Sequence, residues 1–350
     1  MRYAIHFWGH CCTVDTSLNL YEKLHPILEP YMTIEAAEAT VPGKVHFNLE
    51  MNPAAVTDYA RQVESAPALQ LHCDLEGRIH SDNTTAIIYV QELRVAYVLE
   101  RSGGQLAFSY VYDEFTSELE LDFMRIARGA LIALAEASGW RKAHMAVVGQ
   151  EGCGVAFIGG EGAGKTSFML SFLTQLEHAR LITNDKALLA QVPDSGNMEA
   201  YGLPYAVSIG AGALTHLPIE VNSETRIISE EAYFWPREVV RRLERETSRR
   251  IALQWMFHVR IVPEQQGLTC SVVHHAEERR ELLLSHVLCF SDRITPSWLN
   301  RWLDVTVSPV SVPESLLTVP MLRVEGNPWN GGLQEMWRRL QQQAPHSLRS

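Results

Sequence analysis

The chain has 350 residues, of which 46% are hydrophobic and 20% are charged. These proportions are ordinary for a globular protein with a sizeable core, in one large domain or two moderate ones. The 30 basic and 41 acidic side chains give a formal net charge of −11, which argues against general binding to nucleic acids or anionic membranes.

The sequence contains no sign of a membrane or secretory segment. No apolar run approaches the ~20 residues that a membrane-spanning helix needs. The first residues lack the apolar run and cleavage site of a signal peptide. We therefore expect a cytoplasmic protein with no membrane and no nucleic acid among its partners.

The six cysteines are scattered and include no C-x-x-C pair. In a reducing compartment such cysteines are typically small buried hydrophobic residues. A zinc site near the N-terminus is the alternative, but that segment has a strand-like composition and no second ligand pair. Its candidate ligands are His6, His10, Cys11 and Cys12.

Residues 1–117 are predicted to form a β-rich N-terminal module with one helix, over residues 18–31 and interrupted by Pro26. The expected strands cover residues 3–8, 45–51, 85–90, 94–100 and 105–111. The last two flank Ser102-Gly103-Gly104, which predicts a β-hairpin. Because no phosphate loop, metal cluster or nucleophile arrangement is found here, we interpret this part as a packing or substrate-presenting module.

Residues 118–350 are predicted to form an α/β nucleotide-binding domain, because the order of strand, loop, helix and strand is typical of that class. A helix over 119–138 is expected to end at Gly139. The strands that follow are expected over residues 142–148, 155–158, 181–183 and 187–192, with a helix beginning near Lys165. Segments 251–262, 268–274 and 282–290 are expected to complete the α/β body, and a polar helix that frays is expected over 334–350.

A very basic segment, residues 235–250, is predicted to be helical after Pro236. We favour a solvent-exposed helix in which Glu238, Glu244 and Glu246 pair with arginines four residues away. The alternative is a basic wall that faces phosphates or an acidic substrate.

The pattern G-x-x-x-x-G-K-[ST] is matched from Gly159 to Thr166, between an apolar strand and an apolar-faced helix. Such a loop directs backbone N–H groups at phosphate oxygens, and the helix N-terminus adds partial positive charge. Lys165 is expected to reach the β- and γ-phosphates of ATP, and the Thr166 hydroxyl to hold Mg²⁺. A chance match in a glycine-rich turn is the alternative, which the flanking strand and helix disfavour. The expected nucleotide-binding residues are Gly159, Gly160, Glu161, Gly162, Ala163, Gly164, Lys165, Thr166 and Ser167.

Two residues near this loop are candidates for chemistry. Asp185 follows the strand after the loop helix, where a carboxylate can hold Mg²⁺ or accept a proton from an attacking hydroxyl. His144 lies on the strand before the loop strand, and we expect the two strands to be neighbours, so that His144 can hydrogen-bond Asp185. The alternatives are a turn carboxylate and a core histidine. The turn and strand at 202–210 offer only Ser208 as a reactive group.

The segment from His144 to Asp185 resembles the HPr kinase/phosphorylase family and related proteins. His144 lies fifteen residues before Gly159, as a strand histidine does in that family. Residues 159–166 are similar to the family's Gly-x-x-Gly-x-Gly-Lys-[ST] loop, and Asn184-Asp185 stands where the family has an Asp-Asp pair. The resemblance covers roughly residues 90–215, and the turn at Gly202-Leu203-Pro204 is similar too.

This resemblance implies a phosphoenolpyruvate-carboxykinase-like phosphate-loop core and an ATP-dependent kinase. Asp185 would be the base or metal-bound carboxylate, His144 its partner, and Lys165 and Thr166 the phosphate and Mg²⁺ ligands. Asn184 departs from the first acidic residue of the pair, and the family's downstream glycine-rich signature is not found. We therefore do not expect HPr as the substrate or reversal of the reaction.

The sequence as a whole predicts an ATP-dependent kinase that phosphorylates a hydroxyl of a protein, a peptide or a small molecule. The second hypothesis is an ATP-binding regulatory module with weak or no phosphotransfer, and the third is a structural protein with a vestigial loop. Intact Gly164, Lys165 and Thr166 weigh against the third. A homo-oligomer is compatible with the sequence.

Overall fold

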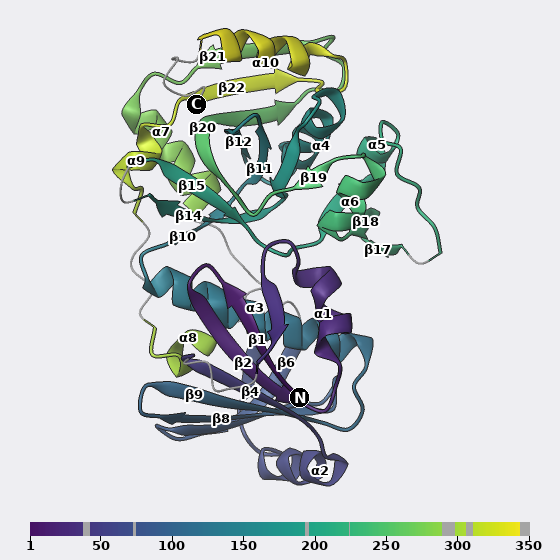
Figure 1. The fold of residues 1–350 in the computed structure, drawn as a ribbon, viewed down its shortest axis with the longest axis vertical. Helices are drawn as coiled ribbons and strands as arrows, with labels where there is room; N and C mark the ends of the chain where they lie inside the picture. The colour runs from purple at the N-terminus through teal and green to yellow at the C-terminus, as the bar shows by residue number, and fades with distance from the viewer. Residues whose placement is uncertain are drawn as a thin grey trace. The chain divides into compact units, whose positions relative to one another are not determined.

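The computed structural model describes residues 1–37, 43–72, 75–192, 196–223, 225–288, 298–305 and 311–343. Within them the chain has a mixed α/β architecture with three sheets (Figure 1). It divides into two compact units, residues 1–139 with 291–308 and residues 140–290 with 309–350. The predicted boundary at residue 118 differs from this division, because helix α3 (Ser117–Ala137) belongs to the first unit.

The first unit contains a nine-stranded sheet in the order β3-β1-β2-β4-β9-β8-β7-β6-β5. Pairs β2–β4 and β4–β9 are parallel, and the other pairs are antiparallel. The strands are β1 (Arg2–Phe7), β2 (His10–Thr16), β3 (Thr33–Ala36), β4 (Val45–Met51), β5 (Ala68–His72), β6 (Leu75–Ser81), β7 (Thr85–Val90), β8 (Val95–Ser102) and β9 (Gln105–Tyr112). The strands of residues 1–112 thus form one sheet, and the hairpin of β8 and β9 pairs Ser102 with Gln105.

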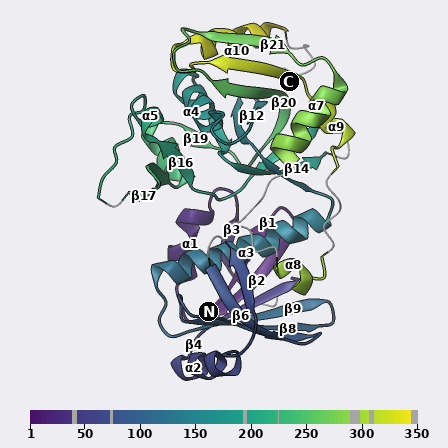
Figure 2. The same cartoon turned by 180° about the vertical axis from the view of Figure 1, so that it is seen from behind.

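Four helices of the described residues accompany this sheet: α1 (Leu20–Leu28), α2 (Pro53–Gln62), α3 and α8 (Leu299–Trp302). Figure 2 shows α3 beside α1, and α3 packs against β2 while α2 packs against β7, β8 and β9. The sequence predicted only α1 as a helix before residue 117. The start of α2 does carry a local signal, since Asn52 caps the Ala55 N–H and Pro53 occupies the first helical position.

A buried carboxylate joins α3 to three strands of this sheet. Asp122 is 1% exposed, and both its oxygens accept hydrogen bonds. His72 Nε2 lies 2.6 Å from Oδ1, and the hydroxyls of Tyr97 and Tyr110 lie 2.6 and 2.7 Å from Oδ2. Burial raises the pKa of both tyrosines well above its ordinary value, and the Asp122 charge adds to it. The tyrosines therefore act as hydrogen-bond donors to the carboxylate.

The second unit contains a ten-stranded sheet in the order β10-β14-β15-β20-β12-β11-β13-β19, in which β22 also pairs with β20 and β21. Its strands are β10 (Arg141–His144), β11 (Ala146–Gln150), β12 (Cys153–Ile158), β13 (Arg180–Thr183), β14 (Lys186–Gln191), β15 (Met198–Gly202), β19 (Glu246–Thr247), β20 (Arg250–Ile261), β21 (Leu268–Val272) and β22 (Met321–Gly326). A separate three-stranded sheet has the strand order β16-β18-β17, with β16 at Val207–Gly210, β18 at Glu231–Phe234 and β17 at Arg226–Ile228.

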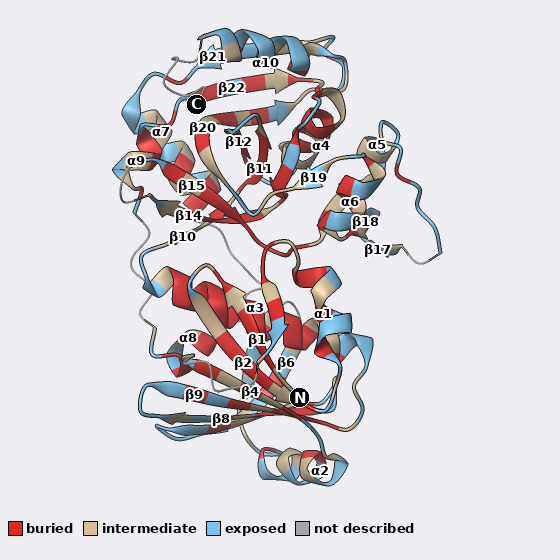
Figure 3. Ribbon diagram, viewed as in Figure 1, coloured by how far each residue is buried: buried red, intermediate tan, exposed pale blue. Residues whose placement is uncertain are grey.

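Hydrophobic clusters cover both faces of the large sheet, so that β11 and β12 are buried except at the half-buried Gln150 and Cys153 (Figure 3). The helices of this unit are α4 (Lys165–Gln175), α5 (Ala211–Leu214), α6 (Pro236–Arg242), α7 (Ala276–Leu283), the π-helical turn η1 (Leu284–Leu288), α9 (Glu314–Leu317) and α10 (Gly332–Gln343). The predicted C-terminal helix corresponds to α10, and residues 344–350 lie outside the described part of the chain.

Two expectations for this unit require correction. The structure has two strands where one was predicted over 142–148. The strand is interrupted at Met145, because the Met145 N–H donates to the Asp185 carbonyl at 2.9 Å. As a result β10 pairs with β14, and only β11 lies beside β12.

The basic helix is also shorter than predicted and ends at Arg242. Glu238 accepts the Trp235 N–H at the start of α6, and Glu246 pairs with Arg180 at 2.9 Å. Arg245 donates to the Leu173 carbonyl at 2.7 Å. Glu238 thus caps its own helix, while Glu246 and Arg245 tie the segment to other parts of the unit instead of lining an exposed helix.

The cysteines are less uniformly buried than expected. Cys12 is buried, Cys11 and Cys153 are half-buried and Cys270 is exposed, while Cys73 and Cys289 lie outside the described residues.

Across the described ranges, no group of three or more His, Cys, Asp or Glu side chains is placed to hold a metal ion. Nor does any helix in that part of the chain have the length and apolar character to cross a bilayer.

Candidate functional site

The glycine-rich loop joins β12 to α4, which confirms the predicted strand, loop and helix. The Lys165 ammonium folds back over the loop and donates to the carbonyls of Gly159 and Gly160, at 2.9 and 3.0 Å. Lys165, Thr166 and Ser167 form the half-buried first turn of α4. The loop is thus curled around the lysine amine, next to the N-terminus of an eleven-residue helix.

Gly164 caps α4 in a conformation that disfavours any side chain. Its φ is 95°, and an added Cβ would lie 2.8 Å from the Cβ of Ile261. Ile261 cannot easily retreat, because its N–H donates to the Ala163 carbonyl at 2.9 Å. Any larger residue at this position must therefore distort the turn that begins the helix.

Gly164→Ala should accordingly lower the free energy of unfolding by about 1–3 kcal/mol through left-handed strain and the Ile261 clash. Chemical denaturation measures this loss. Gly162→Ala is the matched control, because its φ is 73° but no atom lies within 4 Å of an added Cβ. Equal losses in the two variants would mean that the Ile261 contact is unimportant.

His144 and Asp185 are brought together as the sequence predicted. His144 Nε2 lies 3.0 Å from Asp185 Oδ1, and the Asp185 side chain is 37% exposed. Burial would raise the pKa of Asp185, but the His144 hydrogen bond and the charges of Lys186, His144 and Lys165 outweigh it and leave the pKa below its ordinary value. Asp185 is therefore an ionised carboxylate at neutral pH.

The loop lysine and this carboxylate act on each other. Burial lowers the pKa of Lys165, whereas the negative charges of Asp185 and Glu161 oppose the shift. In turn the Lys165 charge contributes to the lowered pKa of Asp185. The residues proposed for phosphate binding and for proton transfer therefore share one electrostatic environment.

Asn184 is buried beside Asp185, with 4% of its surface exposed. Its Nδ2 donates to the Ala206 carbonyl at 3.1 Å, and its Oδ1 has no hydrogen-bond partner among the described residues. Mg²⁺ prefers oxygen ligands, and the Thr166 hydroxyl, the Asp185 carboxylate and this amide oxygen are ligands of that kind. In chemical type, these donors therefore fit a magnesium ion.

Four further residues near the loop carried no recognisable signal in the sequence. Lys186 and Tyr205 contact each other beside Asp185, with the Lys186 ammonium 4.7 Å from the ring centre. His258 and His286 stack at 5.5 Å with 15° between their planes. His286 atoms lie 3.9 Å from the position that a Cβ on Gly160 would occupy.

The histidine stack depends on strand pairing that the sequence does not reveal. His258 lies opposite Ile158 in the parallel β12–β20 pair, at the strand end that leads into the loop. Burial lowers the pKa of His258, and the charges of His286 and Arg323 lower it further. Ser208, by contrast, donates its hydroxyl to Glu231.

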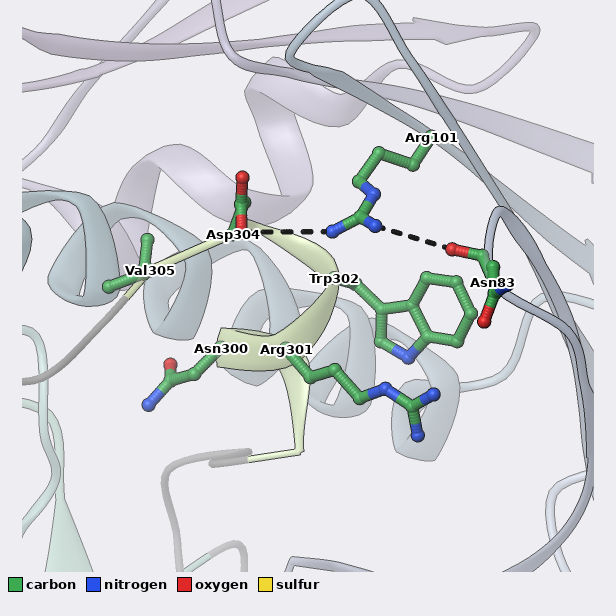
Figure 4. Close-up of a pocket in the computed structure, with 7 residues that line it drawn as sticks. All are labelled: Asn83, Arg101, Asn300, Arg301, Trp302, Asp304 and Val305. Carbon is green, nitrogen blue, oxygen red and sulfur yellow. Dashed lines mark hydrogen bonds and ion pairs between the residues drawn. The ribbon is translucent and has the colours of Figure 1, made fainter.

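A polar cavity of about 350 Å³ lies in the first unit, and none of the predicted site residues lines it. Figure 4 shows Arg101 between Asp304 and the Asn83 carbonyl, at 3.8 and 3.3 Å. The lining residues are Asn83, Arg101, Asn300, Arg301, Trp302, Asp304 and Val305.

No known protein family and no curated protein matches the chain. Among solved structures, the HPr(Ser) kinase/phosphatase from Coxiella burnetii is similar over 58% of this chain and 99% of its own length. The sequence identity is 11% and the TM-score is 0.27. Because this likeness is weak, we base the function on the residues of this chain.

Proposed function

We propose that the chain is an ATP-dependent kinase that transfers the γ-phosphoryl group to a hydroxyl of a protein or peptide serine or of a small molecule. The observation that carries the proposal is the loop geometry, in which Lys165 at the start of α4 folds over the carbonyls of Gly159 and Gly160. The resemblance of residues 144–185 to HPr-kinase-related proteins supports the same activity.

Each residue has a distinct part in this proposal. The loop N–H groups and the N-terminus of α4 bind the phosphates, and Lys165 moves from the loop carbonyls to the β- and γ-phosphate oxygens. Mg²⁺, held by the nucleotide with Thr166 and Asp185, would neutralise charge on the phosphates. Asp185 orients the acceptor hydroxyl, and His144 positions Asp185 through the 3.0 Å contact.

In the transfer step, the acceptor oxygen bonds to the γ-phosphorus as the bond to the bridging β–γ oxygen breaks, and ADP leaves. The hydroxyl proton passes to the Asp185 carboxylate. A carboxylate with a lowered pKa is a weak base, so we expect the proton to move late, after the phosphorus–oxygen bond to ADP has loosened. Most of the rate would then come from positioning and electrostatic stabilisation.

Lys165→Met should lower the affinity for ATP about 10- to 100-fold, because it removes the positive charge that meets the β- and γ-phosphates. Isothermal titration calorimetry with Mg·ATP measures the change. Lys142→Met, on β10 of the same unit, removes an equal charge away from the loop and should leave the affinity within about twofold. Unchanged affinity in Lys165→Met would contradict nucleotide binding at this loop.

An ATP-binding regulatory module with weak or no phosphotransfer is the second candidate. It is favoured by Asn184, which stands where related proteins have an acidic residue, and by the two partners that already engage Asp185. Single-turnover assays with radiolabelled ATP and serine-containing acceptor peptides or small hydroxyl compounds separate the two. ATP that binds tightly at this loop but is never transferred would support the regulatory module.

A further inference from the structure

Lys186 is the one lysine of the described chain that is buried, with 6% of its surface exposed. It begins β14, directly after Asp185, and lies opposite His144 in the antiparallel β10–β14 pair. A buried ammonium is costly unless a negative charge or an aromatic face compensates it. The residues that contact the Lys186 ammonium therefore indicate what stabilises its buried charge.

Lys186 completes the set of partners around the Asp185 carboxylate. Its Nζ lies 3.5 Å from Asp185 Oδ2, while His144 Nε2 lies 3.0 Å from Oδ1. Tyr205, 5% exposed, offers its ring face to the same ammonium at 4.7 Å. The side chain thus lies between a carboxylate and an aromatic ring.

The backbone around Lys186 is also held in place. The Thr183 hydroxyl donates to the Lys186 carbonyl at 2.5 Å, and Asn184 donates to the Ala206 carbonyl, next to Tyr205. Because residues on both sides of the ammonium are bonded, we expect Lys186 to keep its position when the site is empty of nucleotide.

The charge balance at this point differs from that of a paired-carboxylate site. Asp185 supplies one negative charge, which the ammonium of Lys186 compensates at 3.5 Å and on which His144 and Lys165 also act, and Asn184 adds an amide oxygen without charge. A divalent cation that approaches Asp185 Oδ2 must displace or repel the ammonium at 3.5 Å. The triphosphate of a nucleotide brings the additional negative charge that would restore attraction for the metal.

We propose that Lys186 acts as a resident cation on Asp185, so that the chain does not bind a divalent metal by itself and takes Mg²⁺ only together with the nucleotide. The claim that the chain alone binds no divalent metal concerns the nucleotide-free protein. The claim that Mg²⁺ binds together with the nucleotide rests on the proposed function. Lys186 is thereby a positioning residue that sets the order in which metal and nucleotide bind.

The test measures Mn²⁺ binding to the nucleotide-free full-length chain by electron paramagnetic resonance of the unbound ion. The wild type should bind no Mn²⁺ at Asp185 below millimolar concentrations. Lys186→Met keeps a linear apolar side chain against Tyr205 but removes the charge, and it should tighten Mn²⁺ binding about tenfold or more. Adding Asp185→Asn to this variant should abolish the gain, and the control Lys142→Met should behave as the wild type.

Two results would overturn the proposal. One is micromolar Mn²⁺ binding by the nucleotide-free wild type that Asp185→Asn removes. The other is a folded Lys186→Met protein with unchanged Mn²⁺ affinity. If Lys186→Met does not fold, Lys186→Gln replaces it in the same comparison with the wild type. Failure of the kinase proposal is recognised separately, since it would be a lack of ATP binding or transfer and not a change in nucleotide-free Mn²⁺ binding.

Discussion

Asp185→Asn is expected to lower the rate of phosphoryl transfer about 10² to 10⁴-fold, the range typical of a lost general base. The amide keeps the size of the side chain and can still accept a hydrogen bond from His144, but it can neither take the acceptor proton nor carry a negative charge. Because Lys165 and the loop backbone remain, the affinity for ATP should change only a few-fold. Single-turnover transfer and calorimetry measure the two effects separately.

The matched control is Asp58→Asn, an exposed aspartate on α2 whose side chain is 66% accessible. It should leave both transfer and ATP affinity unchanged. A wild-type transfer rate in Asp185→Asn would show that Asp185 is not the base, and the mechanism proposed for this site would then be wrong.

The ionisation of Asp185 also links folding stability to pH. Burial raises the pKa of this carboxyl, but the His144 hydrogen bond and nearby positive charges lower it below the ordinary value of 3.8. Since the folded state holds the proton less tightly than the unfolded state, the ionised group stabilises the fold above about pH 4. This contribution disappears as the pH falls through the folded-state pKa.

We therefore expect the melting temperature of Asp185→Asn to lie below that of the wild type at pH 7 and to approach it at lower pH. The difference should be small, because the side chain is 37% exposed and solvent screens its charges. A difference that grows on acidification would contradict the lowered pKa.

Asp122→Ala should destabilise the first unit by about 3–5 kcal/mol, because three buried donors lose this acceptor and only the Tyr110 hydroxyl keeps another, the Leu119 carbonyl at 3.3 Å. The donors are His72 Nε2 and the hydroxyls of Tyr97 and Tyr110, all within 2.7 Å of the carboxylate. Urea denaturation followed by near-ultraviolet circular dichroism, to which the buried Tyr97 and Tyr110 contribute, measures this loss.

The exposed pair Arg61–Asp58 supplies the control for this prediction. Its side chains are 75% and 66% accessible, so Asp58→Ala should change the free energy of unfolding by less than about 0.5 kcal/mol. Similar losses in Asp122→Ala and Asp58→Ala would mean that the buried network does not hold α3 on the sheet.

Asp122 illustrates what periodicity cannot detect. The apolar spacing of residues 119–138 predicted a helix, and α3 covers Ser117–Ala137. An aspartate within that pattern looks like a solvent-facing residue, yet its partners come from β5, β8 and β9, 50, 25 and 12 residues away along the chain. Only the folded sheet brings those donors together.

The break at Met145 had a similar origin. Residues 142–148 are uniformly suited to a strand, and no glycine or proline interrupts them. The chain divides there because the Met145 N–H bonds to the Asp185 carbonyl, so that β10 and β11 join different neighbours in the sheet. The basic segment, likewise, ends its helix at Arg242 although its composition continues to Arg250.

The sequence by itself determined the strand, loop and helix around Gly159–Thr166, because phosphate-loop geometry depends on glycines and a helix start that are local in the chain. It also predicted the contact of His144 with Asp185, but the contact comes from the pairing of β10 with β14 and not from a strand beside β12. Only the tertiary structure decided that Lys186 and Tyr205 close around the same carboxylate and that His286 lies beside Gly160. These contacts join residues from separate strands and turns, and pairing between strands is set by packing of the whole sheet, which no local pattern records.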